Sequence, residues 1–376
     1  MKRNSSFLRH VIIIGGGIAG LISGIQLRKR GIPCTLFEKK SYPLHRVCGE
    51  YISNEALPFL KRENLFPEKF SPPHINEFLL SSVTGKVSTL PLDLGGFGIS
   101  RFSFDNFLFE TAKNAGVEVN VETEVNSVRF EENHFYVDAA NKIMEADVVI
   151  GAFGKRSKLD VVLKRSFVQK RSPFVGVKYH VRSDHPVNQI ALHNFQGGYC
   201  GINSVEDGIF NICYLSEREN VKKFGSIEAM EENVLHQNPH LKHIFTNSDF
   251  LFQKPEVINE ISFETKSPVE DHILMTGDSA GMIAPLCGNG MAIAIHSAKI
   301  AVEIISDFTV GKISRSEMER RYTVEWRKNF SKRLWRGRKI QLLFGNAALS
   351  QAAVNLVLHS KSLANFLVRK THGQPF

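Results

Sequence analysis

The chain has 376 residues, of which 43% are hydrophobic and 23% are charged. This composition is close to that of average globular proteins and excludes disorder, collagen-like repeats and coiled coil as the main architecture. Five cysteines cannot build a disulfide framework, and their odd number favours a reducing compartment. The net charge of +9 permits an acidic partner without identifying one, and charge alone gives no reason to expect nucleic-acid binding.

The N-terminus and the hydropathy of the chain bear on its location. No segment reaches the roughly 20 apolar residues that a membrane-spanning helix needs. Lys2 and Arg3 precede the apolar run at residues 11–14, a pattern that superficially resembles a signal peptide. Glycines follow this run at a fixed spacing, so we interpret it as the buried first strand of a nucleotide-binding fold. We therefore expect a cytoplasmic protein.

A strand–loop–helix–strand unit of about 30 residues comes first in the chain. Residues 11–14 are apolar and β-branched, as in a parallel strand that is buried on both faces. Apolar residues at helical spacing follow at 21–27, and Gly31 and Pro33 end that helix. Residues 34–38 then have the pattern of a second parallel strand.

The loop between the first strand and the helix reads Gly15-x-Gly17-x-x-Gly20, the dinucleotide-binding fingerprint. The first glycine allows a tight turn, the second lets the backbone approach a pyrophosphate, and the third lets the helix pack closely on the strand. The helix N-terminus favours the pyrophosphate because its free N–H groups point outward. Glu38 ends the second strand, where a carboxylate can bind ribose hydroxyls. We predict FAD or NAD, because an acid disfavours the phosphorylated ribose of NADP.

The remaining chain alternates between two kinds of pattern. Strands that meet glycine, like the first one, are predicted at 147–151 and 273–278, and a small-residue helix follows over 290–305. Short strands and turns fill 165–262, and a hairpin is predicted at 76–92. The short strands indicate an antiparallel layer that is inserted into the first domain.

A second group of glycines lies far along the chain. It consists of Thr276-Gly277-Asp278-Ser279-Ala280-Gly281 and the loop Pro285-Leu286-Cys287-Gly288-Asn289-Gly290-Met291. With these motifs the chain resembles the para-hydroxybenzoate hydroxylase superfamily of FAD enzymes, close to its geranylgeranyl reductase and flavin monooxygenase branch. The resemblance follows the whole chain in the order of its elements and implies FAD as the cofactor.

The resemblance also implies roles for individual residues. In the superfamily, the aspartate at the position of Asp278 binds the ribityl chain of the flavin, and Arg101 matches an arginine that reaches the phosphates. The loop 285–291 places N–H groups and a helix N-terminus beside the flavin ring, where the charge of reduced flavin develops. The residues assigned to FAD binding are Gly15, Gly17, Ile18, Ala19, Gly20, Glu38, Lys39, Arg101, Gly277, Asp278, Pro285, Gly288, Asn289, Gly290 and Met291.

The expected fold class is α/β, and α+β overall. We predict a doubly wound, mostly parallel FAD-binding domain of the Rossmann type, an inserted antiparallel β-sheet substrate domain and a helical C-terminal region. The predicted boundaries are 1–75, 95–164 and 263–310 for the first, 76–94 and 165–262 for the second, and 311–376 for the third.

The electron donor is open between NAD(P)H and a reduced protein partner. The middle motif of the superfamily is usually Gly-Ala-Asp-Gly, and this chain has Gly151-Ala152-Phe153-Gly154 in its place. The acidic residue in that motif has been linked to NAD(P)H use. Its replacement by Phe153 therefore argues against direct use of NAD(P)H as the electron donor and does not argue against the FAD site.

Residues 44–53 follow the second strand and, in the superfamily, pass the flavin. Cys48-Gly49 resembles a pair in geranylgeranyl reductases whose cysteine lies near the ring, and Glu50 resembles the Gly-Glu of halogenase-like members. A thiol near Arg46 is expected to have a lowered pKa and to donate a proton or line the pocket. Cys48, Arg46 and Glu50 are the catalytic candidates. The alternative for Cys48 is a small buried hydrophobe.

These features predict an FAD-dependent oxidoreductase whose small apolar substrate lies between the antiparallel layer and the flavin ring. Our first hypothesis is a hydroxylating monooxygenase of an aromatic or polyketide-like molecule. The alternative, favoured by Cys48-Gly49, is a reductase of isoprenoid double bonds that needs a proton from a nearby acid. A second alternative is a non-catalytic flavin- or prenyl-binding escort, against which the intact loop 285–290 argues.

The C-terminal region is basic. From Lys312 to Lys339 there are eleven Lys or Arg and three Glu, which leaves a surplus of eight positive charges. With Trp335 and later apolar residues, this run predicts either a solvated helix face or peripheral contact with an anionic membrane. No metal site is expected, because no acid or cysteine completes a ligand set with the histidines at 236, 240 and 243.

Overall fold

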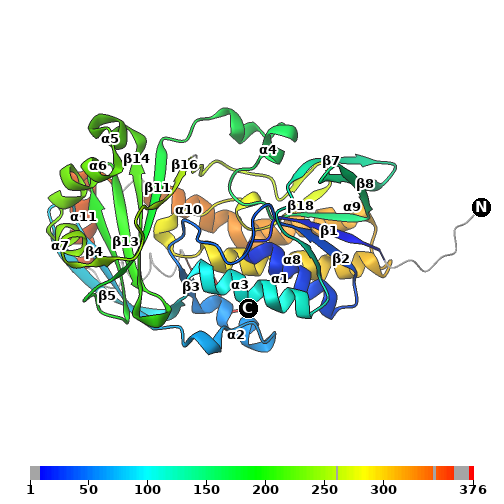
Figure 1. Ribbon diagram of the computed structural model, residues 1–376, viewed down its shortest axis with the longest axis horizontal. Coiled ribbons are helices and arrows are strands. Elements are labelled where there is room, and N and C mark those ends of the chain that lie inside the picture. Colours follow the sequence, from blue (N-terminus) through cyan, green and yellow to red (C-terminus); the bar gives the residue numbers. More distant parts are fainter. Residues whose placement is uncertain (1–8, 260, 342–343, 360–371) are drawn as a thin grey trace, which may run out of the picture.

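The structure is a computed structural model that describes residues 9–259, 261–341, 344–359 and 372–376. A mostly parallel sheet lies at one end of the molecule and a mostly antiparallel sheet at the other (Figure 1). The expected α/β fold, with a nucleotide-binding sheet and a separate antiparallel sheet, is confirmed.

The first sheet has six strands. In spatial order they are β17 (Val269–Glu270), β18 (Ile273–Met275), β10 (Val148–Gly151), β1 (Val11–Ile14), β2 (Cys34–Phe37) and β6 (Glu118–Asn120). All neighbours are parallel except β17 and β18. The side chains of β1 and β10 are buried on both faces, which explains their continuous apolar runs.

Two layers cover this sheet (Figure 1). One consists of the helices α1 (Ile18–Lys29), α3 (Arg101–Asn114) and α8 (Gly290–Thr309). The other is a three-stranded antiparallel sheet of β7 (Val125–Glu131), β8 (His134–Ala139) and β9 (Lys142–Ala146). The second face is thus covered by strands, whereas a doubly wound domain has helices there. The side chains of β7 and β8 alternate between buried and exposed, so one side of this small sheet packs on the protein and the other faces solvent.

The second sheet has nine strands. In spatial order they are β15 (Asp249–Phe250), β11 (Phe174–Arg182), β14 (Phe210–Glu217), β13 (Gly198–Ser204), β12 (Gln189–Phe195), β4 (His74–Ser81), β5 (Val87–Gly98) and β3 (Tyr51–Ser53), with β16 (Glu256–Asn259) also paired to β11. All pairs are antiparallel except β12 with β4. Residues 51–53 were assigned to the FAD domain, but they pair with β5 in this sheet.

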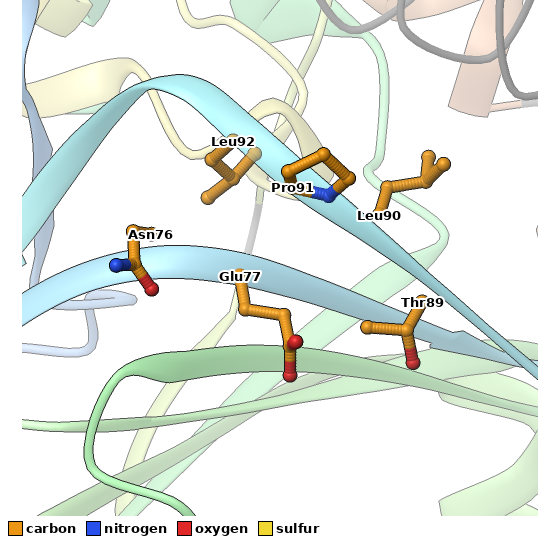
Figure 2. A pocket seen from close by; sticks show the side chains of 6 residues that line it. All are labelled: Asn76, Glu77, Thr89, Leu90, Pro91 and Leu92. Carbon is orange, nitrogen blue, oxygen red and sulfur yellow. The ribbon is translucent and has the colours of Figure 1, made fainter.

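A hollow in the surface of the second sheet lies between β4 and β5 (Figure 2). It is lined by Asn76, Glu77, Thr89, Leu90, Pro91 and Leu92. These residues include none that the sequence assigns to cofactor binding or catalysis. The hollow is therefore separate from the candidate site.

The two faces of the second sheet differ, because side chains alternate along each strand. Val177 and Tyr179 of β11 pack under the helical layer of α5 (Arg218–Phe224), α6 (Ile227–Asn233) and α7 (Pro239–Asn247). Lys178 and His180 lie on the opposite face and contact Glu50. That face points toward the FAD domain.

The C-terminal region is mostly helical in its described part up to residue 359, as expected from its sequence. It comprises α9 (Arg315–Trp326), a π-helical turn (Arg327–Ser331), α10 (Lys332–Gln341) and α11 (Ala347–His359). α9 packs on α8, whereas α11 contacts β4 and β5 of the second sheet. None of the helices in the described ranges combines the length and the apolar character that crossing a bilayer requires. Shorter elements are α2 (Leu57–Arg62), α4 (Lys158–Val162) and the 3-10 turns Asn54–Ala56, Glu68–Phe70, Ser166–Gln169, Glu206–Gly208, Leu235–Gln237, Gly277–Ser279 and Pro285–Cys287.

Candidate functional site

Three glycine-containing segments meet at the carboxyl edge of the first sheet. They follow β1, β10 and β18, whose C-terminal ends are adjacent because these strands are parallel neighbours. A Cβ added to Gly15 would overlap the carbonyl oxygen of Ala152. Gly154 N donates a hydrogen bond to the Ser279 hydroxyl (2.9 Å). This edge of a parallel sheet is where α/β proteins bind nucleotides.

The first glycine motif has the geometry of a pyrophosphate site. Gly15 has φ +105°, and a Cβ on Gly20 would overlap the Gly15 carbonyl oxygen, so both positions require glycine. Gly17 caps α1 without a side-chain hydrogen bond, and no acidic residue lies in the first turn. The N–H groups of Ile18, Ala19 and Gly20 therefore present a partial positive charge in front of the loop.

Arg101, the first residue of α3, faces the same loop. Its guanidinium lies 3.7 Å from the position that a Cβ on Gly17 would take. Asp105, which is fully buried, orients this guanidinium through two hydrogen bonds of 2.6 Å. Arg46 binds the same carboxylate at 3.2 Å. The oriented Arg101 guanidinium thus offers N–H donors to the glycine loop, which suits a pyrophosphate.

Glu38 lies at the end of β2, where the ribose-binding acid is expected. Its carboxylate accepts hydrogen bonds from two backbone N–H groups (2.8 and 3.0 Å) and from Arg46 (3.2 Å). These bonds use three of the roughly four acceptor positions of a carboxylate, which leaves one for a ribose hydroxyl. The side chain of Lys39 is exposed, with Glu124 as a neighbouring charge, and is not brought to the glycine loop.

The second FAD motif offers an acceptor to a ligand. Within the described chain the Asp278 carboxylate makes no hydrogen bond, and Lys266 donates to the Asp278 carbonyl oxygen instead (2.8 Å). Burial raises the pKa of Asp278, and the charges of Lys266, Lys155 and Arg101 oppose this effect. A half-buried carboxylate without a hydrogen-bond donor fits a ligand that brings hydroxyl groups, as the ribityl chain of FAD does.

The loop 285–291 carries Pro285, Gly288, Asn289, Gly290 and Met291 to the start of α8. α8 begins without a side-chain cap and without an acidic residue in its first turn, so its N-terminus favours an anionic atom. A Cβ on Gly288, where φ is +65°, would lie 3.1 Å from the Tyr51 ring. Leu286 N donates to the Tyr199 hydroxyl of the second sheet (3.1 Å). The loop thus contacts both the segment after β2 and the second sheet.

The residues present fit FAD better than NAD. Both cofactors use an uncapped helix N-terminus behind a glycine loop, which α1 supplies. A second uncapped N-terminus, that of α8, lies beside the second sheet. A flavin ring, which carries negative charge when reduced, is stabilised by such a helix N-terminus.

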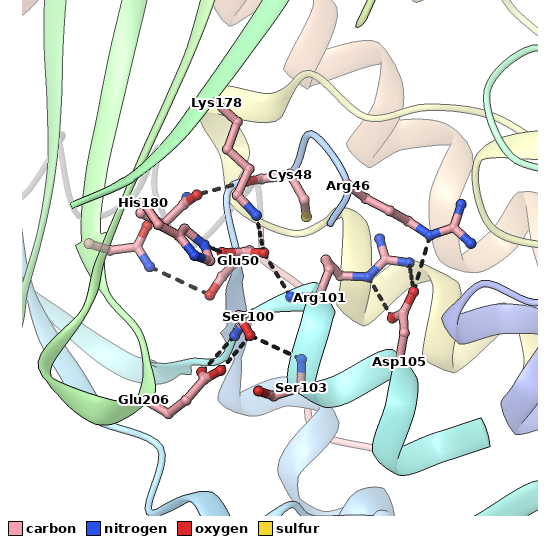
Figure 3. A network of polar contacts seen from close by, with 12 residues as sticks. Arg46, Cys48, Glu50, Ser100, Arg101, Ser103, Asp105, Lys178, His180 and Glu206 are labelled. Carbon is pink, nitrogen blue, oxygen red and sulfur yellow. Dashed lines mark hydrogen bonds and ion pairs between the residues drawn. The ribbon is translucent and has the colours of Figure 1, made fainter. Parts of the chain in front are cut away.

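The predicted catalytic segment leads into a buried ionic network (Figure 3). Glu50 is fully buried, and its carboxylate accepts hydrogen bonds from Lys178 Nζ and from Arg101 N (2.7 Å) and lies 2.6 Å from His180 Nε2. Burial alone would raise the pKa of Glu50, but the Lys178 charge and the His180 hydrogen bond outweigh it and lower the pKa to about 2. Glu50 is therefore ionised at neutral pH and can act in catalysis only through the groups that it holds.

Cys48 and Arg46 do not form the expected pair. Arg46 turns to Asp105 and Glu38, and the guanidinium that acts on the thiol is that of Arg101. Burial raises the pKa of the Cys48 thiol, so the expected lowering is wrong. The cause is the desolvation of the thiolate, which outweighs the nearby cations. At neutral pH the sulfur keeps its proton.

Sequence reasoning missed Lys178 and His180. A signal was present, because two ionisable residues at i and i+2 of an otherwise apolar strand share one face. Nothing in the sequence connects that face with Glu50, which is 128 residues away from Lys178. It also missed Glu206, whose carboxylate accepts a hydrogen bond from Ser100 N at 2.8 Å.

Beside the ionic network, the face toward the FAD domain is apolar. Leu192, Tyr199 and Leu215 of the second sheet pack with Ile261 and with Val354 of α11. Partly buried side chains extend this apolar cluster to the loop 285–291, and they include Phe174, Phe263, Met282, Leu286 and Phe344. The surface suits an apolar molecule that reaches the ionic network with one end.

Comparisons with known proteins agree on the class of protein. The pattern of the FAD binding domain family matches residues 9–336. Digeranylgeranylglycerophospholipid reductase 2 of Methanopyrus kandleri is 23% identical over 338 residues, which are 86% of this chain and 83% of the relative.

Two solved structures share the fold. A geranylgeranyl bacteriochlorophyll reductase-like protein from Thermoplasma acidophilum superimposes with a TM-score of 0.78 at 17% identity, over 96% of this chain and 95% of that one. A probable FAD-dependent monooxygenase from Pseudomonas aeruginosa gives a TM-score of 0.74 at 15% identity, over 92% and 98%. At this level of identity, the two likenesses describe architecture and not reaction.

Proposed function

Because this chain belongs to the family of proteins with an FAD binding domain and is an FAD-dependent oxidoreductase, we propose that it reduces carbon–carbon double bonds of an apolar isoprenoid chain. The observation that carries the proposal is the position of Cys48, whose segment lies where the two domains meet. Asn211 of the substrate sheet donates to the Cys48 carbonyl oxygen (3.2 Å), and Arg101 connects Cys48 with the glycine loop.

Reduction of a double bond needs two groups in one place. Bound FAD, when reduced, supplies the hydride. The second carbon of the double bond needs a proton, so a group that keeps its proton at neutral pH must lie beside it. Cys48 meets this requirement because burial raises the pKa of its thiol. Glu50 does not, because its pKa is lowered to about 2.

The other residues of the site bind, orient and exclude water. Arg101 and the N-terminus of α1 would hold the pyrophosphate of FAD, Asp278 its ribityl hydroxyls and the N-terminus of α8 the flavin ring. The apolar face around Leu192 and Leu215 would take the hydrocarbon chain and keep water from the reacting carbons. The names of the Methanopyrus and Thermoplasma proteins, a reductase and a reductase-like protein, support this substrate class.

Hydroxylation, the first hypothesis from the sequence, is the second candidate. The name of the Pseudomonas monooxygenase supports it, and an apolar pocket that excludes water suits that chemistry as well. Mass spectrometry of the product separates the two candidates. The purified protein is reduced with dithionite under argon, freed of excess dithionite, and mixed with a geranylgeranyl ether lipid under argon or with a phenol in air. Lipid that gains two hydrogens supports reduction, and a product that gains one oxygen supports hydroxylation. Tight lipid binding without either product would support the escort hypothesis.

We propose a reduced protein as the electron donor, in place of direct transfer from NAD(P)H. Phe153 occupies the position of the acidic residue of the middle motif, and its Cα would lie 2.8 Å from a Cβ on Gly15. The Phe153 ring lies against Gly151 of β10, where its Cε1 would be 2.9 Å from an added Cβ. A hydrocarbon ring offers no hydrogen bond to a nicotinamide nucleotide. Bleaching of the flavin by NADPH and NADH without oxygen tests this proposal. Slow bleaching by both, with dithionite still effective, is expected, and fast bleaching by either contradicts it.

We also propose that the basic helix face delivers the protein to an anionic lipid surface. Arg327, Lys328, Lys332 and Lys339 are exposed on one continuous helical segment, and Trp335, which is 55% exposed, lies among them. Basic residues around an exposed aromatic ring are typical of membrane-surface helices.

Co-sedimentation with vesicles that contain phosphatidylglycerol tests the membrane contact. We expect wild-type protein to bind in low salt and the Lys332→Glu, Lys339→Glu variant to lose binding. The matched control is Lys222→Glu, Lys223→Glu, which makes the same change of charge on α5 and should bind normally. Equal loss in both variants, or no binding by the wild type, contradicts the proposal.

A further inference from the structure

Lys178 is an ammonium group sealed inside the protein beside the proposed reaction site. It lies on β11, on the face toward the FAD domain, and 0% of its surface is exposed. Its Nζ pairs with Glu50, whose second carboxylate oxygen binds His180 (Figure 3). The residues assigned so far to FAD and to the proton do not include Lys178 or His180.

β11 passes directly over the segment that carries Cys48. A Cβ on Gly176 would lie 3.3 Å from Val47, and Lys178, on the same face, pairs with Glu50. Contacts from the second sheet thus reach the residue before Cys48 and the second residue after it. Burial is the main cause of the raised pKa of the Cys48 thiol; the charge of Glu50 raises it further, and the charges of Arg101 and Lys178 lower it.

Packing does not account for this network. Replacing a buried ion pair by apolar side chains is often neutral or stabilising in proteins, so the stability of the sheet gives no reason for Glu50 and Lys178. The Glu50 carboxylate receives three donors, from Lys178, His180 and the backbone of Arg101. It supplies the counter-charge that a buried ammonium needs and fixes its position.

We propose that Lys178 returns the proton to Cys48 after each turnover, and that Glu50 and His180 are positioning residues that hold Lys178 for this transfer. The inference rests on the proposed function, in which Cys48 gives a proton to the substrate. It deepens that function by naming the group from which the thiol recovers its proton.

The step conserves atoms and charge. The substrate gains the hydride of reduced FAD and the thiol proton, so it is reduced by two electrons while FAD is oxidised. The S–H bond of Cys48 breaks, and its electron pair stays on sulfur. Through one water molecule between the two groups, an N–H bond of Lys178 then breaks as a new S–H bond forms, which turns thiolate and ammonium into thiol and amine. A proton from the solvent restores the ammonium after the product has left.

The neighbouring ionisable groups do not compete for this proton at neutral pH. Burial raises the pKa of Cys213, on β14, to about 12. Burial and the nearby Lys178 lower the pKa of His45, on the loop after β2, to about 4. Both groups are therefore neutral. The charged neighbours are Arg101 on α3 and Glu206 before β14, and Glu206 accepts its hydrogen bonds from Ser100.

The test measures the thiol itself. The FAD-bound protein is treated with iodoacetamide at a series of pH values, and mass spectrometry gives the alkylation rate of the peptide that contains Cys48. Lys178→Met removes the charge, so the alkylation profile should move to higher pH, and the rate at a fixed pH below the thiol pKa should fall about tenfold for each pH unit that the profile moves. Lys178→Arg keeps the charge but cannot release a proton. It should keep the wild-type profile and lose turnover.

The matched control is His193→Gln. His193 is as buried as His180, but it lies on the opposite face of the second sheet and binds Ser81 at 2.9 Å. This control should leave the profile of Cys48 unchanged. If Lys178→Met fails to fold or to retain FAD, Lys178→Gln replaces it, because its amide carries no charge but can still donate a hydrogen bond to Glu50.

The outcomes separate this inference from the proposed function. An unchanged Cys48 profile in the variant that lacks the Lys178 charge would refute the coupling of the two groups. Normal turnover of Lys178→Arg would refute the proton transfer. A wild-type protein that reduces no double bond would refute the proposed function, but the alkylation profiles would still report the coupling because they need no substrate.

Discussion

Removal of the Glu50 charge should cost the protein several kcal/mol of stability at neutral pH. The pKa of Glu50 is lowered from 4.5 to about 2, although burial alone would raise it. At about 1.36 kcal/mol per pH unit, this lowering corresponds to ~3 kcal/mol of the free energy of unfolding. Removing one partner of a buried ion pair costs a similar amount, about 3–5 kcal/mol.

The sign of the pH dependence follows from the direction in which the pKa moves. The folded-state pKa of Glu50 lies below its unfolded value, so its contribution is fully present above about pH 4.5. The contribution is lost as the pH falls toward about 2. The difference between wild type and Glu50→Gln should therefore shrink on acidification through this window.

Urea unfolding of the FAD-bound protein, at neutral pH and at about pH 3, measures both effects. Glu206→Gln is the matched control: Glu206 is a buried carboxylate at the same helix N-terminus, and its hydrogen bonds come from the uncharged N–H and hydroxyl of Ser100. We expect the control to lose about 1–2 kcal/mol. A loss in Glu50→Gln that is no larger than in the control would refute the reasoning.

Three further predictions concern FAD binding and turnover. Asp278→Ala should lower the FAD-to-protein ratio after gel filtration, and full retention would show that Asp278 does not bind FAD. Gly15→Ala places a Cβ against the Ala152 carbonyl at φ +105°, so we expect loss of flavin and a lower Tm. A variant that stays yellow and keeps the wild-type Tm would contradict the requirement for glycine at this position. Cys48→Ser should keep FAD and lower turnover by roughly 100-fold. Unchanged turnover would make Cys48 a packing residue.

The FAD motifs could be predicted because each sits on a strand that ends in glycine. Residues 11–20, 148–154 and 273–278 carry local patterns that need no knowledge of the rest of the chain. Their meeting at one edge follows from parallel pairing, which the strand–helix–strand order already indicates. The cover of the first sheet was harder to predict, because β7, β8 and β9 pair with one another and nothing in their sequence indicates which face they cover.

The ionic network could not be predicted from local patterns. Whether Lys178 or Tyr179 faces the FAD domain depends on the register of β11 with β14 and β16, which is a non-local property. Glu50 has φ +52°, a backbone conformation that is uncommon for a residue other than glycine. The neighbouring residues in the sequence do not predict this conformation. The direction expected for the pKa of Cys48 was wrong for a related reason. A sequence shows which charged residues are near in the chain, but it does not show how far burial removes the thiol from water.

Double-bond reduction by bound FAD is tested most directly by an anaerobic single turnover. The protein is reduced, freed of excess dithionite and mixed with a geranylgeranyl ether lipid while the flavin absorbance is followed. We predict that the oxidised flavin spectrum returns without oxygen, that the lipid gains two hydrogens, and that both events are slowed in Cys48→Ser. Flavin that stays reduced in the presence of the lipid and is reoxidised only when oxygen is admitted would contradict a double-bond reductase.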